Sequence, residues 1–378
     1  MLEKLVQRIV EIISQRKKAM FNQVKTRLYV AKYSTGLQDK IKDIEKVLRQ
    51  QHSGKVQMVG IVGLGGVGKT TLALEFFNRK SSGYTNSHFL SDVRENAKSP
   101  AQLLHWQREL LKRITNQHID NIHQGKQMLK EFLSKPKFQF LIVLDDVDNQ
   151  EQVDSLLPDR DVYCSNTLIL ITSRDRDVLI RSGVEEISIY KLKGLPLKHS
   201  RELFCSFAFS KPYPLRGFED LVNEFVMACQ GLPLSLKVFG AFLSGENDKS
   251  LWKNTLSRIH ELPNDIHKKL KISYDALPEK EKQIFLDIAC FFLGSKKDAT
   301  VEIWDEPSCK GSSRFQNLES KCLVEVDSDN YIHMHDHLRD LGREIARDKL
   351  PLRLWHPTEN IDTLLQSLVS PQSFSVFN

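Results

Sequence analysis

Residues 56–77 read VQMVGIVGLGGVGKTTLALEFF, and this stretch decides the first part of the fold. It begins with an apolar run typical of a buried strand, passes through a glycine-rich turn and continues with a helical pattern. Gly63 to Thr70 match the pattern G-x-x-x-x-G-K-[ST] in full. Because the match lies between a strand and a helix, the context that this motif requires, the sequence predicts a phosphate-binding loop.

The residues of this loop suit a nucleotide. Glycine lets the backbone curl so that its N–H groups surround phosphate oxygens, and the following helix adds partial positive charge. We expect Lys69 to reach the β- and γ-phosphates and the Thr70 hydroxyl to bind Mg²⁺. The expected cofactors are ADP or ATP and Mg²⁺. The candidate cofactor-binding residues of the loop are Gly63, Gly65, Gly66, Val67, Gly68, Lys69, Thr70 and Thr71.

A second apolar run, LIVLDDVD (Leu141 to Asp148), ends in acids. Ligands of open parallel sheets bind at the carboxyl ends of the strands, so these acids are candidates for the same site. We expect Asp145 to be a metal ligand together with Thr70, and Asp146 to orient or deprotonate an attacking water. The alternative is that the two acids are exposed and simply cap a strand.

A third run ends in Thr172-Ser173-Arg174-Asp175. An arginine at the tip of a neighbouring strand can reach the γ-phosphate, which makes Arg174 a catalytic candidate beside Asp145 and Asp146. The alternative is a surface arginine paired with Asp175 or Asp177.

Apolar strands alternate with helical patterns in the first half of the chain, which predicts an α/β domain with a parallel sheet covered on both faces. The expected strands are 56–62, 89–93, 140–147, 167–174 and 187–192. The expected helices between them include 37–48, 70–78, 103–115 and 126–133.

From about residue 198 the pattern is mostly helical, with helices expected at 200–209, 218–229, 234–243, 252–260 and 279–292. Residues 323–326 and 331–334 then flank Asp327-Ser328-Asp329-Asn330, a hairpin signal, and a helix is expected at 337–347. Helices followed by a hairpin predict a winged-helix-like unit. The expected divisions are a basic helical linker (1–54), a P-loop domain (55–193), a helical domain (194–270), a winged-helix-like domain (271–350) and a tail (351–378).

The chain has 378 residues, six cysteines and a formal net charge of +6. Residues 1–55 hold 13 Lys and Arg against 5 Asp and Glu, so the basic surplus lies in this segment, which we interpret as a solvated helix face. We find no secretory signal and no apolar run long enough for a membrane helix. Scattered cysteines without a C-x-x-C pair are typical of free thiols, so we expect a cytoplasmic or nucleocytoplasmic protein.

Six motifs in order carry a family resemblance: GLGGVGKTT, LIVLDDVD, LILITSRD, GLPLSLKVFG, FLDIACFF and MHDHLRDLGREIAR. Together they resemble the NB-ARC module of plant disease-resistance proteins. The segments FLSDVREN (89–96) and VAKYSTGL (30–37), with Asp148, are similar to the branch that carries an N-terminal Toll/interleukin-1 receptor domain.

The resemblance implies a role for further residues. Asp145 would be the Walker B acid and Arg174 a sensor arginine, while Pro233 would pack near the adenine or ribose and His335 would contact the β-phosphate of ADP. The string GLPL occurs twice, and we interpret the copy at 194–197 as coincidental and the copy at 231–234 as the family motif.

The resemblance also implies a function: a switch in plant defence signalling, closed with ADP and open with ATP, and at most a slow ATPase. The family's flanking signalling and leucine-rich-repeat domains are not recognisable here. Expected partners are nucleotide, other copies of the chain when ATP is bound, and full-length resistance proteins. The rival functions are a P-loop ATPase with true turnover and a nucleic-acid-binding regulator; the near-neutral body of the chain disfavours nucleic acid.

Overall fold

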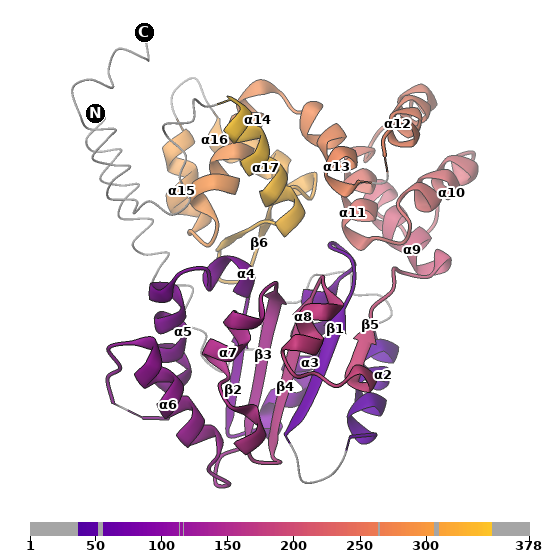
Figure 1. Ribbon diagram of the computed structural model, residues 1–378. Coiled ribbons are helices and arrows are strands. Elements are labelled where there is room, and N and C mark those ends of the chain that lie inside the picture. Colours follow the sequence, from indigo (N-terminus) through magenta and orange to yellow (C-terminus); the bar gives the residue numbers. More distant parts are fainter. Residues whose placement is uncertain are drawn as a thin grey trace, which may run out of the picture. The chain divides into compact units, whose positions relative to one another are not determined.

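The computed structural model describes residues 37–51, 56–112, 114–115, 117–263, 265–305 and 310–349 (Figure 1). These residues fall into two compact units, one ending at Gly240 and the other beginning at Ala241. Residues 1–36 of the expected basic helical linker and the tail after residue 350 lie outside the described residues. None of the described helices is long and apolar enough to cross a membrane.

The first unit contains a five-stranded parallel sheet, as the sequence predicts, and the order of its strands is β2-β3-β4-β1-β5. The strands are β1 (Gln57–Val62), β2 (Asn86–Leu90), β3 (Phe140–Val147), β4 (Thr167–Ser173) and β5 (Ile189–Lys191). Because β4 lies between β1 and β3, the strand that leads into the glycine-rich loop and the strand that ends in acids are not neighbours. The carboxyl end of β4 therefore stands between the two halves of the expected site.

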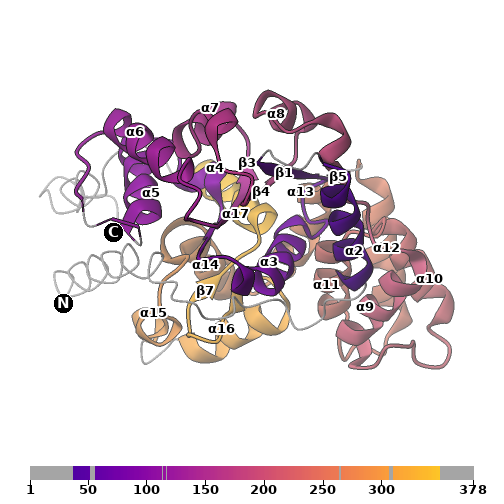
Figure 2. The same ribbon diagram turned by 90° about the horizontal axis from the view of Figure 1, so that it is seen from below.

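Helices cover both faces of this sheet (Figure 2). They are α2 (Leu37–Arg49), α3 (Lys69–Lys80), α4 (Val93–Asn96), α5 (Pro100–Lys112), α6 (Ile122–Leu133), α7 (Gln150–Leu156) and α8 (Arg176–Arg181). Helices α2 and α3 lie on one face, and α7 and α8 lie on the other. Successive side chains of a strand point to opposite faces of the sheet. The central strands are continuously apolar, so they present apolar side chains to both faces.

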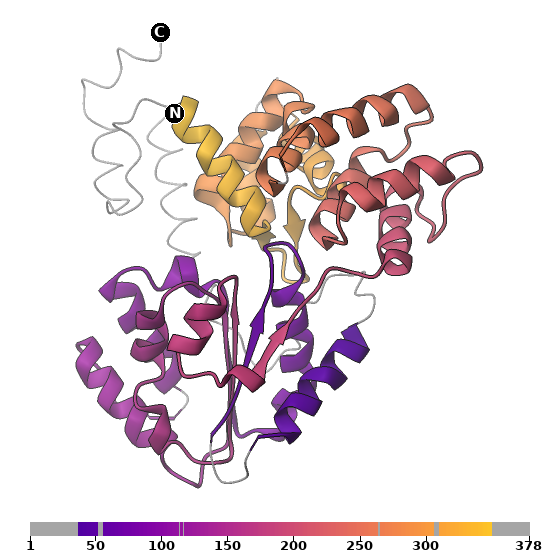
Figure 3. The same cartoon turned by 45° about the vertical axis from the view of Figure 1, so that its right-hand side comes forward.

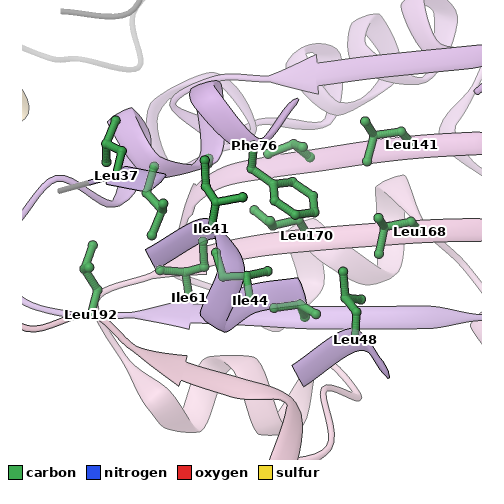
Figure 4. Close-up of a cluster of buried hydrophobic side chains, with 14 of the residues drawn as sticks. Leu37, Ile41, Ile44, Leu48, Ile61, Phe76, Leu141, Leu168, Leu170 and Leu192 are labelled. Carbon is green, nitrogen blue, oxygen red and sulfur yellow. The ribbon is translucent and has the colours of Figure 1, made fainter. Parts of the chain in front are cut away.

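The core on one face joins α2 and α3 to the sheet (Figure 4). Ile41 and Ile44 of α2 and Phe76 of α3 are buried against Ile61 and Leu170 of the strands. The opposite side of α2 is charged and carries the ion pairs Lys42–Asp39 and Lys46–Asp43, which are exposed. The described part of the basic segment is therefore a helix with an exposed charged face, and most of the Lys and Arg residues of 1–55 lie outside the described residues.

Strands β2 and β5 differ most from expectation. Strand β2 ends at Leu90 instead of reaching residue 93, because Asp92 adopts a left-handed conformation (φ 55°) and begins α4. Strand β5 covers only Ile189–Lys191, since residues 186–188 form a 3₁₀ turn before it. Helix α4, absent from the sequence prediction, therefore occupies the place of the expected strand end.

After the sheet the chain is helical. The elements are α9 (Leu197–Phe209), α10 (Glu219–Ala228), α11 (Pro233–Phe242), α12 (Lys249–Glu261), α13 (Ile266–Asp275), α14 (Glu279–Asp287), α15 (Lys297–Trp304), α16 (Gly311–Ser320) and α17 (Asp336–Lys349). Helix α14 continues as a wider π turn at Ile288–Phe292, so the single helix expected over 279–292 has two parts.

The second unit ends in the expected hairpin, followed by α17, which is yellow in Figure 3. Strands β6 (Glu325–Val326) and β7 (Ile332–His333) pair antiparallel. The core beside them is aromatic: Trp304 packs edge-on against Phe292 at 5.5 Å and stacks on Phe315 at 6.5 Å between ring centroids. Helices α14 to α17 with this hairpin form the winged-helix-like arrangement that the sequence predicts.

Candidate nucleotide-binding site

The glycine-rich loop joins the end of β1 to the first residue of α3. Gly66 (φ 76°) and Gly68 (φ 97°) both adopt left-handed conformations, which side chains disfavour. Gly68 is also the N-cap of α3 and supplies no side-chain hydrogen bond to the first turn. The N–H groups of that turn therefore suit an external anion, the usual ligand of a helix start.

Lys69 lies within this loop. Its side chain is buried, and its Nζ donates to the carbonyl oxygens of Gly63 at 2.9 Å and Leu64 at 3.2 Å. The ammonium group is thus held over the loop, where a phosphate would provide a charged acceptor in place of neutral carbonyls.

Thr70 and Asp145 meet across the sheet end, as the sequence predicts. The Thr70 hydroxyl donates to Asp145 Oδ2 at 2.9 Å, and the Thr172 hydroxyl donates to Asp145 Oδ1 at 2.7 Å. Asp145 is only 3% exposed. A buried carboxylate beside a hydroxyl is the kind of oxygen-only ligand set that Mg²⁺ prefers, so these residues fit the metal.

Asp146 is turned away from Asp145 by its backbone. The residue adopts φ 55° at a register shift of β3 between Leu144 and Val147. Its N–H donates to Thr172 Oγ1 at 2.9 Å, which fixes the turn. Both Asp145 and Asp146 are buried, at 3% and 5% exposure, so the alternative of two exposed acids is wrong.

The side chain of Asp146 lies between two arginines. Arg174 Nε donates to Oδ1 at 3.3 Å, and Arg94 Nε lies 2.9 Å from Oδ2 as an ion pair. Arg174 thus stands at the end of β4, beside the acids of β3. Asp175, the partner considered for Arg174 in the surface alternative, caps α8 by accepting the Asp177 N–H at 2.8 Å.

Pro233 begins α11 next to the loop. The N–H of Leu234 donates to the Gly66 carbonyl at 3.4 Å, which ties this helix start to the glycine-rich turn. The two GLPL copies also contact each other, since Leu195 N–H donates to the Gly231 carbonyl at 2.8 Å. The first copy thus packs against the second, and the interpretation of its sequence match as coincidental stays a prediction.

His335 belongs to the second unit and precedes α17. Its Nδ1 accepts the N–H of His337 at 3.3 Å, and its carbonyl accepts those of Leu338 and Arg339. His335 therefore caps the helix. Asp336 is the first helical residue, and its Oδ1 lies 3.4 Å from Arg339 Nη2. The contact of His335 with nucleotide stays a prediction.

Sequence reasoning missed Thr172 and Arg94. Thr172 is the first residue of the quoted strand tip, and its hydroxyl contacts both acids. The signal for Thr172 in the sequence was a side-chain hydroxyl at the end of an expected strand. Arg94 lies in FLSDVREN, which served only to assign the subclass, and α4 is what brings it to Asp146.

Comparisons with known proteins agree with this geometry. The NB-ARC domain family matches residues 37–213, and the winged-helix domain of the Roq1-like disease resistance protein family matches residues 278–350. Disease resistance protein RPV1 of Vitis rotundifolia is 36% identical over 90% of this chain and 25% of its own length. TMV resistance protein N of Nicotiana glutinosa is 34% identical over 82% of this chain and 27% of its length. The chain thus spans about a quarter of these curated relatives.

Among solved structures, a signal transduction ATPase with numerous domains and a tetratricopeptide repeat sensor, from Pyrococcus horikoshii, matches with a TM-score of 0.53. It covers 93% of this chain and 48% of that chain at 16% identity, so the likeness shows the fold alone. The sequence relatives are of the branch with an N-terminal Toll/interleukin-1 receptor domain, as the motifs indicate. The chain therefore belongs to the NB-ARC family of plant disease-resistance proteins.

Proposed function

We propose that this chain is a nucleotide-dependent switch of plant immune signalling, which rests with ADP and is activated with ATP. One observation carries the proposal: Thr70, Asp145 and Arg174 come from three different elements and converge at the carboxyl ends of β1, β3 and β4. Open parallel sheets bind phosphates at that edge.

Each residue has a task in the switch. Lys69 exchanges its loop carbonyls for the β- and γ-phosphates, and the start of α3 donates N–H groups to the same anion. Thr70 and Asp145 hold Mg²⁺, which supplies charge neutralisation to the phosphates when bound. Arg174 moves from Asp146 to the γ-phosphate and so distinguishes ATP from ADP.

The two nucleotide states differ in their contacts with the rest of the chain. Pro233, tied to the loop through Leu234 and Gly66, packs beside the adenine or ribose. His335 contacts the β-phosphate of ADP and holds the closed state, while ATP favours an open state that self-associates. A nucleotide can shift the equilibrium between the closed and open states only if its affinities for the two states differ. Hydrolysis is slow and resets the switch, and full-length resistance proteins are the expected partners.

The nucleotide carried by the purified protein tests this function directly. The protein is denatured, and the released nucleotide is identified by chromatography and counted per mole of chain. We expect the wild type to carry about one ADP per chain and the Lys69→Ala variant to carry none. Lys42→Ala removes an exposed lysine of α2 and should keep the ADP.

Three other results would contradict the switch. Empty protein that turns over added ATP rapidly would indicate an ATPase with true turnover. Empty and inert protein would indicate a degenerate site. Binding of DNA with a steep dependence on salt would indicate a nucleic-acid-binding regulator. The closed-state lock has a separate measurement: His335→Ala should release ADP faster than the wild type, and equal release rates would exclude the lock.

A further inference from the structure

We infer that Arg94 is a positioning residue that keeps the Asp146 carboxylate paired when Arg174 turns to the γ-phosphate, and that it thereby sets the affinity for ATP relative to that for ADP. The inference rests on the proposed function, because it concerns how the same site distinguishes the two nucleotides. Its basis is one buried carboxylate held by two arginines from different elements.

The two arginines contact different carboxylate oxygens of Asp146. Arg174 contacts Oδ1 at 3.3 Å and Arg94 contacts Oδ2 at 2.9 Å. The Asp146 side chain is 6% exposed, and the side chains of Arg94 and Arg174 are 18% and 29% exposed. Water therefore has little access to the carboxylate, and its charge depends on these partners for compensation.

Local structure fixes the backbone around Arg94 more firmly than the backbone around Arg174. Helix α4 is anchored by Val93, which is fully buried, and by Trp106, whose Nε1 donates to the Asn96 carbonyl at 3.0 Å. On the other side, Thr172 holds the backbone of Asp146. Arg174 instead follows the last residue of β4 and lies outside regular structure, so it has more freedom to change partner.

Removing Arg174 from Asp146 has an electrostatic cost. Asp145, the preceding residue, is also buried, and its carboxylate lies between the hydroxyls of Thr70 and Thr172. Two buried carboxylates would then stand beside a triphosphate, which is a clustering of like charge. Arg94 offsets this cost because it remains on Oδ2. Arg174 is then able to leave for the γ-phosphate.

Loss of Arg94 should therefore act on one nucleotide only. Without it, Arg174 becomes the neutralising partner of Asp146 and is no longer available to the γ-phosphate. ADP lacks that phosphate and does not compete for Arg174, so its affinity should be unchanged. A purely structural role of Arg94 in holding α4 predicts a different result, namely weaker binding of both nucleotides.

The test measures the Mg²⁺-dependent affinities of the full chain for ATP and for ADP by calorimetry, after the bound nucleotide has been removed. Arg94→Ala is expected to lower the ATP-to-ADP affinity ratio roughly tenfold, within the usual range of coupling between sites. Arg94→Lys should restore part of the ratio, because it returns the charge without the guanidinium geometry.

A double-mutant cycle identifies Asp146 as the connection. In an Asp146→Asn background there is no carboxylate to neutralise, so Arg94→Ala should leave the ratio nearly unchanged. Arg160→Ala is the matched control, since Arg160 is 15% exposed and pairs with Asp154 before β4 begins. That variant should keep the wild-type ratio.

The outcomes separate this inference from the proposed function. Wild-type protein that binds neither nucleotide overturns the proposed function and this inference with it. Wild-type protein that binds both nucleotides, with equal losses for ATP and ADP in Arg94→Ala, overturns the inference alone. The same holds if the full effect of Arg94→Ala persists in the Asp146→Asn background.

Discussion

The N–H of Leu195 donates to the carbonyl of Gly231 across 2.8 Å, so two identical Gly-Leu-Pro-Leu turns lie directly against each other. The two backbone segments approach each other closely at both glycines. A Cβ on Gly194 would lie 2.9 Å from the Gln230 carbonyl oxygen, and one on Gly231 would lie 2.6 Å from the Leu195 carbonyl oxygen. Through Leu234 N–H and Gly66 O, the second turn also reaches the glycine-rich loop. The paired turns thus position the start of α11 at the nucleotide site.

We expect Gly231→Ala to destabilise the protein and to reduce the amount of bound nucleotide. Gly231 has φ +70°, and a non-glycine residue there costs about 1–3 kcal/mol of stability even before the clash with Leu195. Thermal unfolding and the nucleotide content per mole of chain measure the two effects.

Gly245→Ala is the matched control for this prediction. Gly245 has φ +77°, but a Cβ there meets nothing within 4 Å. The Gly245→Ala variant therefore has the backbone strain without the clash. It should lose stability while keeping its nucleotide. If both variants retain nucleotide equally, the paired turns do not position the site.

Gly63→Ala tests the glycine-rich loop by another route. A Cβ at Gly63 would lie 2.8 Å from the Leu192 carbonyl oxygen and 3.0 Å from Val67 Cγ1, so the loop or the end of β5 must shift. Because Lys69 donates to the Gly63 carbonyl, the shift also displaces the lysine. We expect nucleotide affinity to fall at least about tenfold, since misplacement of a positioning group by an ångström is costly. Equilibrium binding measures it, and Gly83→Ala, which adds a Cβ into open space, should bind as the wild type does.

The strands of this fold could be predicted because parallel strands buried on both faces read as continuous apolar runs. Strand β3, at Phe140–Val147, has the predicted bounds. Strand β2 does not, since the apolar pattern around Val93 continues into α4 and only the left-handed backbone of Asp92 separates the two elements. A hydrophobic pattern carries no signal for that change of backbone direction.

The site was predictable to the extent that its residues lie next to one another in sequence. Lys69 and Thr70 come from one motif and Asp145 and Asp146 from another. The contacts of Thr172 and Arg94 depend on β4 lying between β1 and β3, and on α4 turning over the end of β3. Strand order and helix direction arise from tertiary packing, so no local pattern contained them.

The ion pair between Glu45 of α2 and Lys80 of α3 predicts a pH-dependent stability. Their atoms lie 2.6 Å apart, and the hydrogen bond from Lys80 holds the pKa of Glu45 below its usual value. A carboxyl with a lowered folded-state pKa stabilises the fold above the unfolded-state pKa, and this contribution is lost as the pH falls through the folded-state pKa. Since the pair is partly exposed, its contribution should be below about 1 kcal/mol.

We therefore expect Glu45→Gln to be less stable than the wild type at pH 7, and the difference to be smaller near pH 3, because protonation of Glu45 removes the charge from the pair. Chemical unfolding at the two pH values measures this difference. Glu109→Gln removes a longer surface pair with Lys112 and should differ less from the wild type at pH 7. A Glu45→Gln difference that is as large at pH 3 as at pH 7 would mean that packing, not charge, is responsible.

Thr172→Val removes a hydroxyl that joins the two acids. The hydroxyl donates to Asp145 Oδ1 and accepts the N–H of Asp146, and both partners are buried. Valine has nearly the same shape but cannot form either bond, so a buried N–H loses its acceptor, at a cost of about 1–3 kcal/mol. The stability of Thr172→Val should fall by that amount in chemical unfolding, whereas Thr172→Ser keeps the hydroxyl and should stay close to the wild type.

The same substitution should also weaken the contribution of magnesium. Without the Thr172 hydroxyl, the carboxylate of Asp145 loses a hydrogen bond that orients it toward Thr70, and residues that orient a metal ligand affect metal affinity strongly. We expect the ratio of nucleotide affinity with Mg²⁺ to that with excess chelator to fall about tenfold in Thr172→Val. If chelation weakens nucleotide binding equally in wild type, Thr172→Val and Thr172→Ser, then Thr172 supports the fold of β4 but has no part in holding the metal ligand.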